Sequence, residues 1–213
     1  MPRHIRWAAT MVGLVFMLAG AQSALRADTK SSVEEIRKEL MQLPYYSVFD
    51  YLAFSYDKGT VTLAGYAYHL GLKQDAVRAA KRASGVDQVV DKIEELSVSP
   101  LDDDIRWKTY YAIYRDPSLS RYAPGGGLLW GHRHAFGAGF HGGVGGRFSG
   151  MEPLGDFPIH IIVKGGRTIL MGVVDSESDK TVAGMRAREV PGAFAVDNEL
   201  VVEQQEALRS TKK

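Results

Sequence analysis

Aromatic and basic side chains are concentrated in one short stretch of the sequence. Its members are Arg106, Trp107, Lys108, Tyr110, Tyr111, Tyr114 and Arg115. Aromatic rings are favoured at the depth of lipid headgroups, and cations beside them attract anionic phosphates. The stretch can therefore bind a phospholipid surface or a partner protein, provided that its rings face water.

Helical spacing predicts which of these side chains are exposed. At about 100° per residue, Ile105, Thr109 and Ala112 share one stripe, which we assign to the core. The rings expected on the opposite face, near water, are those of Trp107, Tyr111 and Tyr114. A helix rotated by one or two residues places the same rings in the core, so the pattern leaves both arrangements open.

Histidines and aspartates are the other residues with ligand chemistry. His132 and His134 have the H-x-H spacing found in metal ligation, and His141 follows them. Their surroundings are rich in glycine and give little rigidity, so we expect no functional metal site. His69 and His160 are predicted to stand alone, and the aspartates at 102–104 are predicted to be a solvated helix start.

No local pattern of residues indicates catalysis. The sequence shows no nucleophile beside a base and no paired acids, and the glycines at 125–127 lack the Lys-Ser/Thr of a phosphate loop. We therefore predict a protein that is not an enzyme and has no cofactor. A formal net charge of +1 gives no reason to expect nucleic acid as a partner.

The N-terminal residues predict export. Basic Arg3 and Arg6 precede an apolar run over 7–18 and an Ala19-Gly20-Ala21 cleavage site, so residues 1–21 are predicted to be a signal peptide. The apolar run is shorter than the roughly 20 residues that span a bilayer. The chain has no cysteine, which excludes disulfides and lipid attachment to an N-terminal cysteine. We expect a periplasmic protein, soluble after cleavage, without a transmembrane span.

The remaining chain contains an internal repeat. Gly59, Gly65 and Gly85 recur 107 residues later as Gly166, Gly172 and Gly192, and similar residues surround each pair. Alternating apolar residues before the first glycine predict a strand, and the short link after it predicts an antiparallel hairpin. A helix with small inner residues and a final strand follow in each copy. These six positions are predicted to be structural glycines.

An additional amphipathic helix precedes each hairpin. In the first copy its apolar stripe consists of Val33, Ile36, Leu40 and Leu43. The predicted fold class is therefore α+β, with two tandem α-β-β-α-β modules. Each module is expected to be a small mixed three-stranded sheet covered by two helices.

The hairpin at 59–65, the helix of small residues and the Gly-Val-Asp-Gln-Val-Val-Asp segment at 85–91 resemble the BON domain family of bacterial envelope proteins. The resemblance covers residues 31–98 and 102–203, apart from an insertion. It implies a non-catalytic module that binds phospholipid surfaces or other envelope components. BON domains occur in osmotically induced periplasmic proteins, secretins and mechanosensitive channels.

The second copy departs from this pattern at two places. Thr168 stands where the first copy has Val61, and a glycine-rich insertion over 124–157 separates its first helix from its first strand. We expect the insertion to be a mobile loop and residues 204–213 to be a charged tail.

The resulting hypothesis is an envelope protein that binds anionic phospholipid membranes through its second module, with the first module as a scaffold. The alternative is an adaptor that docks onto another envelope protein or onto peptidoglycan without contacting lipid.

Overall fold

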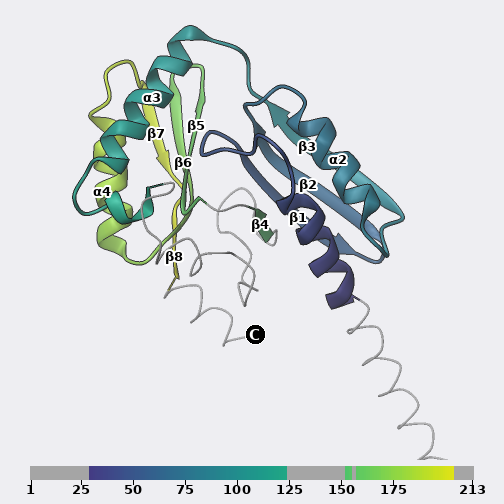
Figure 1. Ribbon diagram of the computed structural model, residues 1–213. Helices are drawn as coiled ribbons and strands as arrows, with labels where there is room; N and C mark the ends of the chain where they lie inside the picture. Colours follow the sequence, from purple (N-terminus) through teal and green to yellow (C-terminus); the bar gives the residue numbers. More distant parts are fainter. Residues whose placement is uncertain (1–28, 124–151, 155–156, 204–213) are drawn as a thin grey trace, which may run out of the picture.

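The computed structural model of the protein describes residues 29–123, 152–154 and 157–203 (Figure 1). The predicted signal peptide, most of the predicted mobile loop and the predicted C-terminal tail lie outside the described residues. The histidines of the insertion, His132, His134 and His141, lie outside them as well.

The first module starts with a helix over 29–41, which carries Val33, Ile36 and Leu40 of the predicted apolar stripe on its buried side, while Leu43 lies beyond its end and packs against the same core. The elements that follow are β1 (Tyr51–Asp57), β2 (Thr60–Ala67), α2 (Leu72–Arg82) and β3 (Gln88–Glu95). The second module consists of α3 (Pro100–Tyr114), η1 (Ser120–Tyr122), β5 (Ile159–Lys164), β6 (Arg167–Val174), α4 (Glu177–Arg188), β7 (Ala195–Asn198) and β8 (Val201–Val202).

The two modules repeat the same strand pairing. In each, a hairpin is antiparallel, with Leu52 opposite Gly65 and Ile159 opposite Gly172. In each, the helical crossover makes the last strand parallel to the second strand of the hairpin. The predicted α+β fold of two tandem modules is confirmed.

Two details of the sheets differ from the prediction. Residues of the insertion form β4 (Glu152–Leu154), which pairs with β1 and extends the first sheet to four strands in the order β3-β2-β1-β4. The last strand of the second module, expected to run without a break, is divided into β7 and β8. The break occurs where Leu200 turns into the core, since its side chain is buried.

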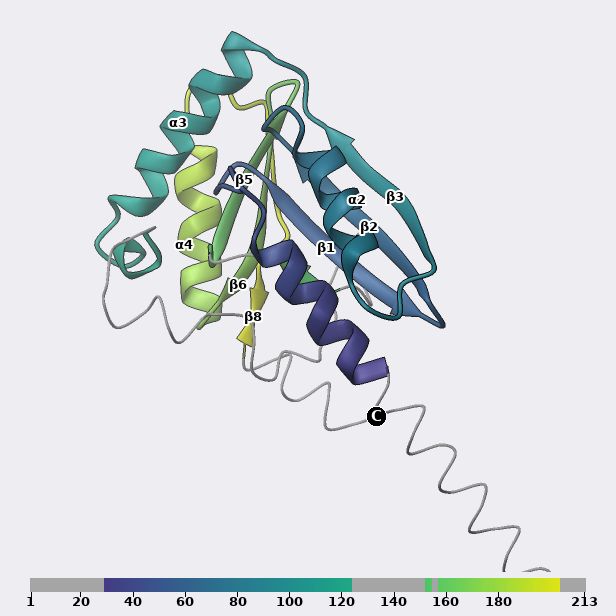
Figure 2. The same ribbon diagram turned by 45° about the vertical axis from the view of Figure 1, so that its right-hand side comes forward.

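The sheets of the two modules pack face to face, with helices on the outer sides (Figure 2). The side chains between the sheets are Tyr51, Ala53, Tyr66 and Leu96 from the first module and Ile162, Ile169 and Met171 from the second. The segment before β1 also crosses the junction, because Val48 and Phe49 belong to the core cluster of the second module. The two modules therefore share buried surface.

The repeated glycines adopt backbone conformations that side chains disfavour. The φ angle is +82° at Gly59 and +76° at Gly166, and +80° at Gly85 and +95° at Gly192. Gly65 and Gly172, inside β2 and β6, have φ of +131° and +117°. Only glycine adopts such angles readily, so the repeat preserves turns and close approaches of the backbone.

Gly172 provides a test of this constraint. A Cβ atom at Gly172 would clash with the carbonyl oxygen of Pro158, whereas one at Gly165 would meet nothing within 4 Å. We expect Gly172→Ala to lower the free energy of unfolding by about 3 kcal/mol, and Gly165→Ala by only about 1 kcal/mol. Urea unfolding of both variants measures the difference, and equal losses would contradict the role of Gly172.

Candidate functional site

The local sequence fixes where α3 begins. Ser99 caps the helix by accepting a hydrogen bond from the backbone N–H of Asp102 at 3.2 Å, and Pro100 occupies the first turn. The buried stripe of α3 consists of Asp102, Ile105, Arg106, Thr109, Ile113 and Tyr114. This stripe packs over β5 of the second module and sets which side chains of the helix remain accessible.

The aspartates at the start of α3 are not all solvated, contrary to the prediction. Asp102 is buried, because its carboxylate accepts hydrogen bonds from the backbone N–H groups of Gly165 at 2.9 Å and Gly166 at 2.8 Å. Asp103 pairs with Arg106, and Asp104 pairs with Lys108. Asp102 thus joins α3 to the turn of the β5–β6 hairpin.

The prediction that Tyr114 lies near water is wrong. Its side chain is buried, and its hydroxyl donates a hydrogen bond to the carbonyl oxygen of Ile159. Burial raises the pKa of Tyr114. The helix is rotated relative to the expected orientation, since Ile113 is fully buried and Ala112 only half-buried.

Arg106 is also removed from the accessible surface. Only 1% of the residue is exposed, and its guanidinium donates to Asp103 and to the carbonyl oxygen of Val163. The same group lies 4.5 Å from the centroid of the Tyr68 ring, a cation–π contact. Arg106 therefore stabilises the packing of α3 on β5 and is not part of the exposed surface.

The other members of the predicted site lie together on the accessible side of α3. Trp107 is 49% exposed and Tyr111 is 44% exposed, with ring centroids 6.1 Å apart. Tyr110 is half-buried beside them, its ring 5.5 Å from that of Tyr111. Arg115 lies 4.2 Å from the centroid of the Tyr111 ring, and Lys108 is exposed. We call Trp107, Lys108, Tyr110, Tyr111 and Arg115 the α3 aromatic face.

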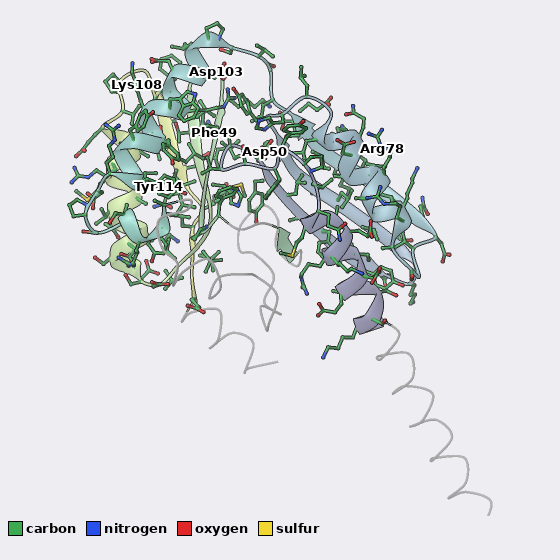
Figure 3. All side chains as sticks on the ribbon, viewed as in Figure 1. Phe49, Asp50, Arg78, Asp103, Lys108 and Tyr114 are labelled. Carbon is green, nitrogen blue, oxygen red and sulfur yellow. The ribbon has the colours of Figure 1, made fainter. Side chains whose placement is uncertain are left out.

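Phe49 and Tyr68 of the first module adjoin this face, and sequence reasoning missed both. The Phe49 ring lies 5.0 Å from that of Trp107 and 5.8 Å from that of Tyr68. Figure 3 shows Phe49 at the junction of the two modules. Neither residue belongs to a local motif, so only the packing of one module on the other identifies them.

Asp50, next to Phe49, is fully buried near the junction of the two modules (Figure 3). Its Oδ1 accepts hydrogen bonds from the backbone N–H groups of Tyr68 at 2.6 Å and His69 at 3.1 Å. Its Oδ2 accepts from the backbone N–H of Ser47 at 3.0 Å and from the Ser47 hydroxyl at 2.7 Å. The loops over 44–50 and 68–71 are thereby fixed to each other.

Comparison with known families identifies the repeated unit. The BON domain family matches residues 53–96 and 147–204, which span the hairpin, helix and last strand of each module. The chain contains two BON domains. The predicted family is therefore confirmed, and this family indicates a non-catalytic protein associated with the cell envelope.

Other comparisons add little to this assignment. No curated protein matches the sequence. One similar solved structure is the C-terminal domain of CdsD, a structural protein of the type III secretion system of Chlamydia trachomatis. It is 13% identical to this chain, with a TM-score of 0.25, and the match covers 80% of this chain and 96% of that chain. A second CdsD structure has 15% identity and a TM-score of 0.24, covering 85% and 97%. Similarity at this level carries no argument about the present protein.

Asp50 also links the two histidines that were predicted to stand alone. His69 Nδ1 lies 2.9 Å from Asp50 Oδ2, and His160 Nδ1, from the second BON domain, donates to the backbone carbonyl of Asp50. Burial lowers the pKa of His160 to about 4. Within the described ranges, no group of three or more side chains is placed to hold a metal ion. Nor does any helix in these ranges have the length and apolarity to cross a membrane.

His160 predicts how stability depends on pH. The unfolded chain takes up a proton at the ordinary pKa of 6.5, while the folded protein resists protonation until about pH 4. Stability is therefore complete above pH 6.5 and is lost as the pH falls toward 4, by about 3 kcal/mol in total. Chemical unfolding of wild type and His160→Gln at intervals from pH 7.5 to 4 measures the effect.

Gln is uncharged throughout this pH range, so it has no proton to gain. We expect the free energy of unfolding of His160→Gln to depend less steeply on pH across this range. Parallel curves for the two proteins would contradict the assignment to His160.

Proposed function

We propose that the protein binds the surface of anionic phospholipid membranes in the cell envelope through the α3 aromatic face of its second BON domain. The observation that supports this most directly is the exposure of Trp107 and Tyr111, of which 49% and 44% remain in water. Folding leaves these large rings half-covered, and the membrane interface is the environment that such rings prefer.

The first BON domain serves as an internal control for this interpretation. Its first helix aligns with α3 through two buried pairs, Ile36 with Ile105 and Arg37 with Arg106. In that alignment Lys38 occupies the position of Trp107, and Gln42, the first residue after the helix, occupies that of Tyr111. The Trp107 ring packs partly on Phe49, so the fold accounts for its covered half. The exposed halves of Trp107 and Tyr111 have no counterpart in the first domain.

The size of the exposed rings indicates a reversible association. Aromatic side chains bury roughly 200 Å² when fully covered, so covering the exposed halves of two rings yields about 5 kcal/mol. This energy corresponds to a dissociation constant in the sub-millimolar range, before electrostatic attraction is added. The protein is therefore expected to bind peripherally.

Charge on the α3 aromatic face determines the preferred lipid. Arg115 and Lys108 flank the rings, and a cation near an anionic surface contributes about 1 kcal/mol. Lys108 pairs with exposed Asp104, but pairs of this kind contribute little in water and exchange readily for a phosphate. Anionic headgroups are thus preferred over zwitterionic ones.

The alternative, an adaptor that recruits proteins by strand addition at a sheet edge, has less support. The end strand β3 carries Asp91, Lys92, Glu94 and Glu95. Charged side chains on an edge strand oppose pairing with another chain. Docking onto peptidoglycan or a partner protein through the α3 aromatic face remains the competing outcome of the experiments below.

Vesicle co-sedimentation tests the proposal. Residues 22–213 are mixed with vesicles of equal parts phosphatidylglycerol and phosphatidylethanolamine. We expect wild type to bind and Trp107→Ala/Tyr111→Ala to bind at least about tenfold more weakly, because the rings supply most of the buried area. Met185→Ala, at a 51% exposed apolar residue of α4, is the matched control and should bind as wild type does. Absence of wild-type binding rules out the proposal.

Neutralising the two cations tests the electrostatic contribution. Lys108→Gln/Arg115→Gln should weaken binding to these vesicles by about thirtyfold and reduce its sensitivity to salt, because two favourable contacts with phosphate are lost. Arg78→Gln/Lys81→Gln removes the same charge from the exposed side of α2 and should have no such effect. Equal losses in both variants would show that net charge, and not this face, controls binding.

A further inference from the structure

We propose that the first BON domain supplies a second lipid contact, formed by Tyr45, His69 and Leu70 and named here the loop tip. This inference rests on the proposed function, since it adds a second contact with the same bilayer. The loop tip takes a phospholipid bilayer as its ligand, with Tyr45 and Leu70 entering the interface and His69 between them.

Both apolar members of the loop tip project into water. Leu70 is 87% exposed and Tyr45 is 78% exposed, more than either ring of the α3 aromatic face. Tyr45 is held at φ +66°, a left-handed conformation that costs a residue with a side chain about 1 kcal/mol. An exposed aromatic ring in a strained conformation adds nothing to the core and points to a role in binding.

A continuous series of ring contacts joins the loop tip to the α3 aromatic face. The Tyr45 ring stacks on that of His69, with centroids 6.4 Å apart, and the His69 ring lies 5.2 Å from that of Tyr68. Tyr68 contacts Phe49, which contacts Trp107. A chain of ring contacts, which passes through the buried Phe49 ring, therefore connects the two exposed patches across the domain junction.

Hydrogen bonds hold the loop tip in place. Asp50 binds the backbone N–H and the Nδ1 of His69, so it fixes the loop that carries Leu70. The carbonyl oxygen of His69 accepts a bond from Leu72 N at 3.2 Å, and Gly71 at φ +87° closes the turn. Leu70 is thus presented by a short, braced turn, which lowers the entropy cost of inserting it.

A bilayer fits this geometry better than a protein partner does. Two apolar side chains at the ends of adjacent turns can enter a soft interface separately, whereas a protein partner would need a pocket for each. Lys108 and Arg115, on the α3 aromatic face, supply the attraction to anionic headgroups. Contact at both patches would fix the orientation of the protein on the membrane.

Site-specific labelling tests the inference, because the chain has no cysteine of its own. Tyr45→Cys, Leu70→Cys and Met185→Cys are each labelled with a fluorophore whose emission shifts to the blue in apolar surroundings. The probe membrane is again phosphatidylglycerol with phosphatidylethanolamine. We expect a blue shift at positions 45 and 70 and none at 185, the control on α4.

A second measurement separates this inference from the proposed function. In a Trp130→Phe background, Trp107 is the single tryptophan of residues 22–213, and its emission reports on the α3 aromatic face. A shift of Trp107 without shifts at positions 45 and 70 overturns the inference and leaves the proposed function intact. No shift at any of the three positions overturns both.

Loss of affinity completes the test. Tyr45→Asn/Leu70→Ser should weaken vesicle binding by about tenfold or more, since an inserted leucine alone contributes that much. Asn accepts the left-handed conformation of position 45, so the fold is preserved, and an unchanged urea midpoint confirms this. Wild-type affinity in this variant would also overturn the inference.

Discussion

The fully buried carboxylate of Asp50 is the interaction on which the arrangement of this protein depends. It satisfies backbone N–H groups of two loops of the first BON domain, while its own carbonyl accepts from His160 of the second. A buried carboxylate is tolerated only when it is surrounded by donors, and here the donors come from two loops of the first domain, at Ser47 and at Tyr68 and His69. Asp50 therefore couples the shape of both loops to the position of the second domain.

That coupling makes the two BON domains a single structural unit. Val48 and Phe49, adjacent to Asp50, enter the core of the second domain, and Ile161 N donates to Val48 O at 2.8 Å beside β5. The reverse occurs at β1, whose edge is covered by β4 from the insertion of the second domain. Each hairpin thus has its open edge covered by a segment of the other domain, which limits pairing with other chains.

The fold could be predicted from sequence because its determinants are local and occur twice. Positive φ at Gly65 and Gly172 and the alternation before each hairpin are properties of short segments. The site could be predicted only in part. Trp107 and Tyr111 are exposed as expected, but Tyr114 is buried because β5 lies beneath it. Phe49 lies next to Trp107 through a contact between the two domains, which the periodicity of either segment does not predict.

The duplicated module allows the exposed ring of Trp107 to be compared with the equivalent position in the first copy. Both copies must keep the buried stripe of their first helix, so Ile36 and Ile105 stay apolar and the adjacent arginines stay buried. The accessible side of the same helix is free of that constraint, and there the copies have diverged, with Lys38 in one and Trp107 in the other. Trp107 is half-exposed beside Tyr111, whose ring contacts Arg115, and exposed apolar groups of this size mark surfaces that associate with partners. Comparison of the two copies thus distinguishes the buried stripe that both share from the exposed rings that only the second copy has.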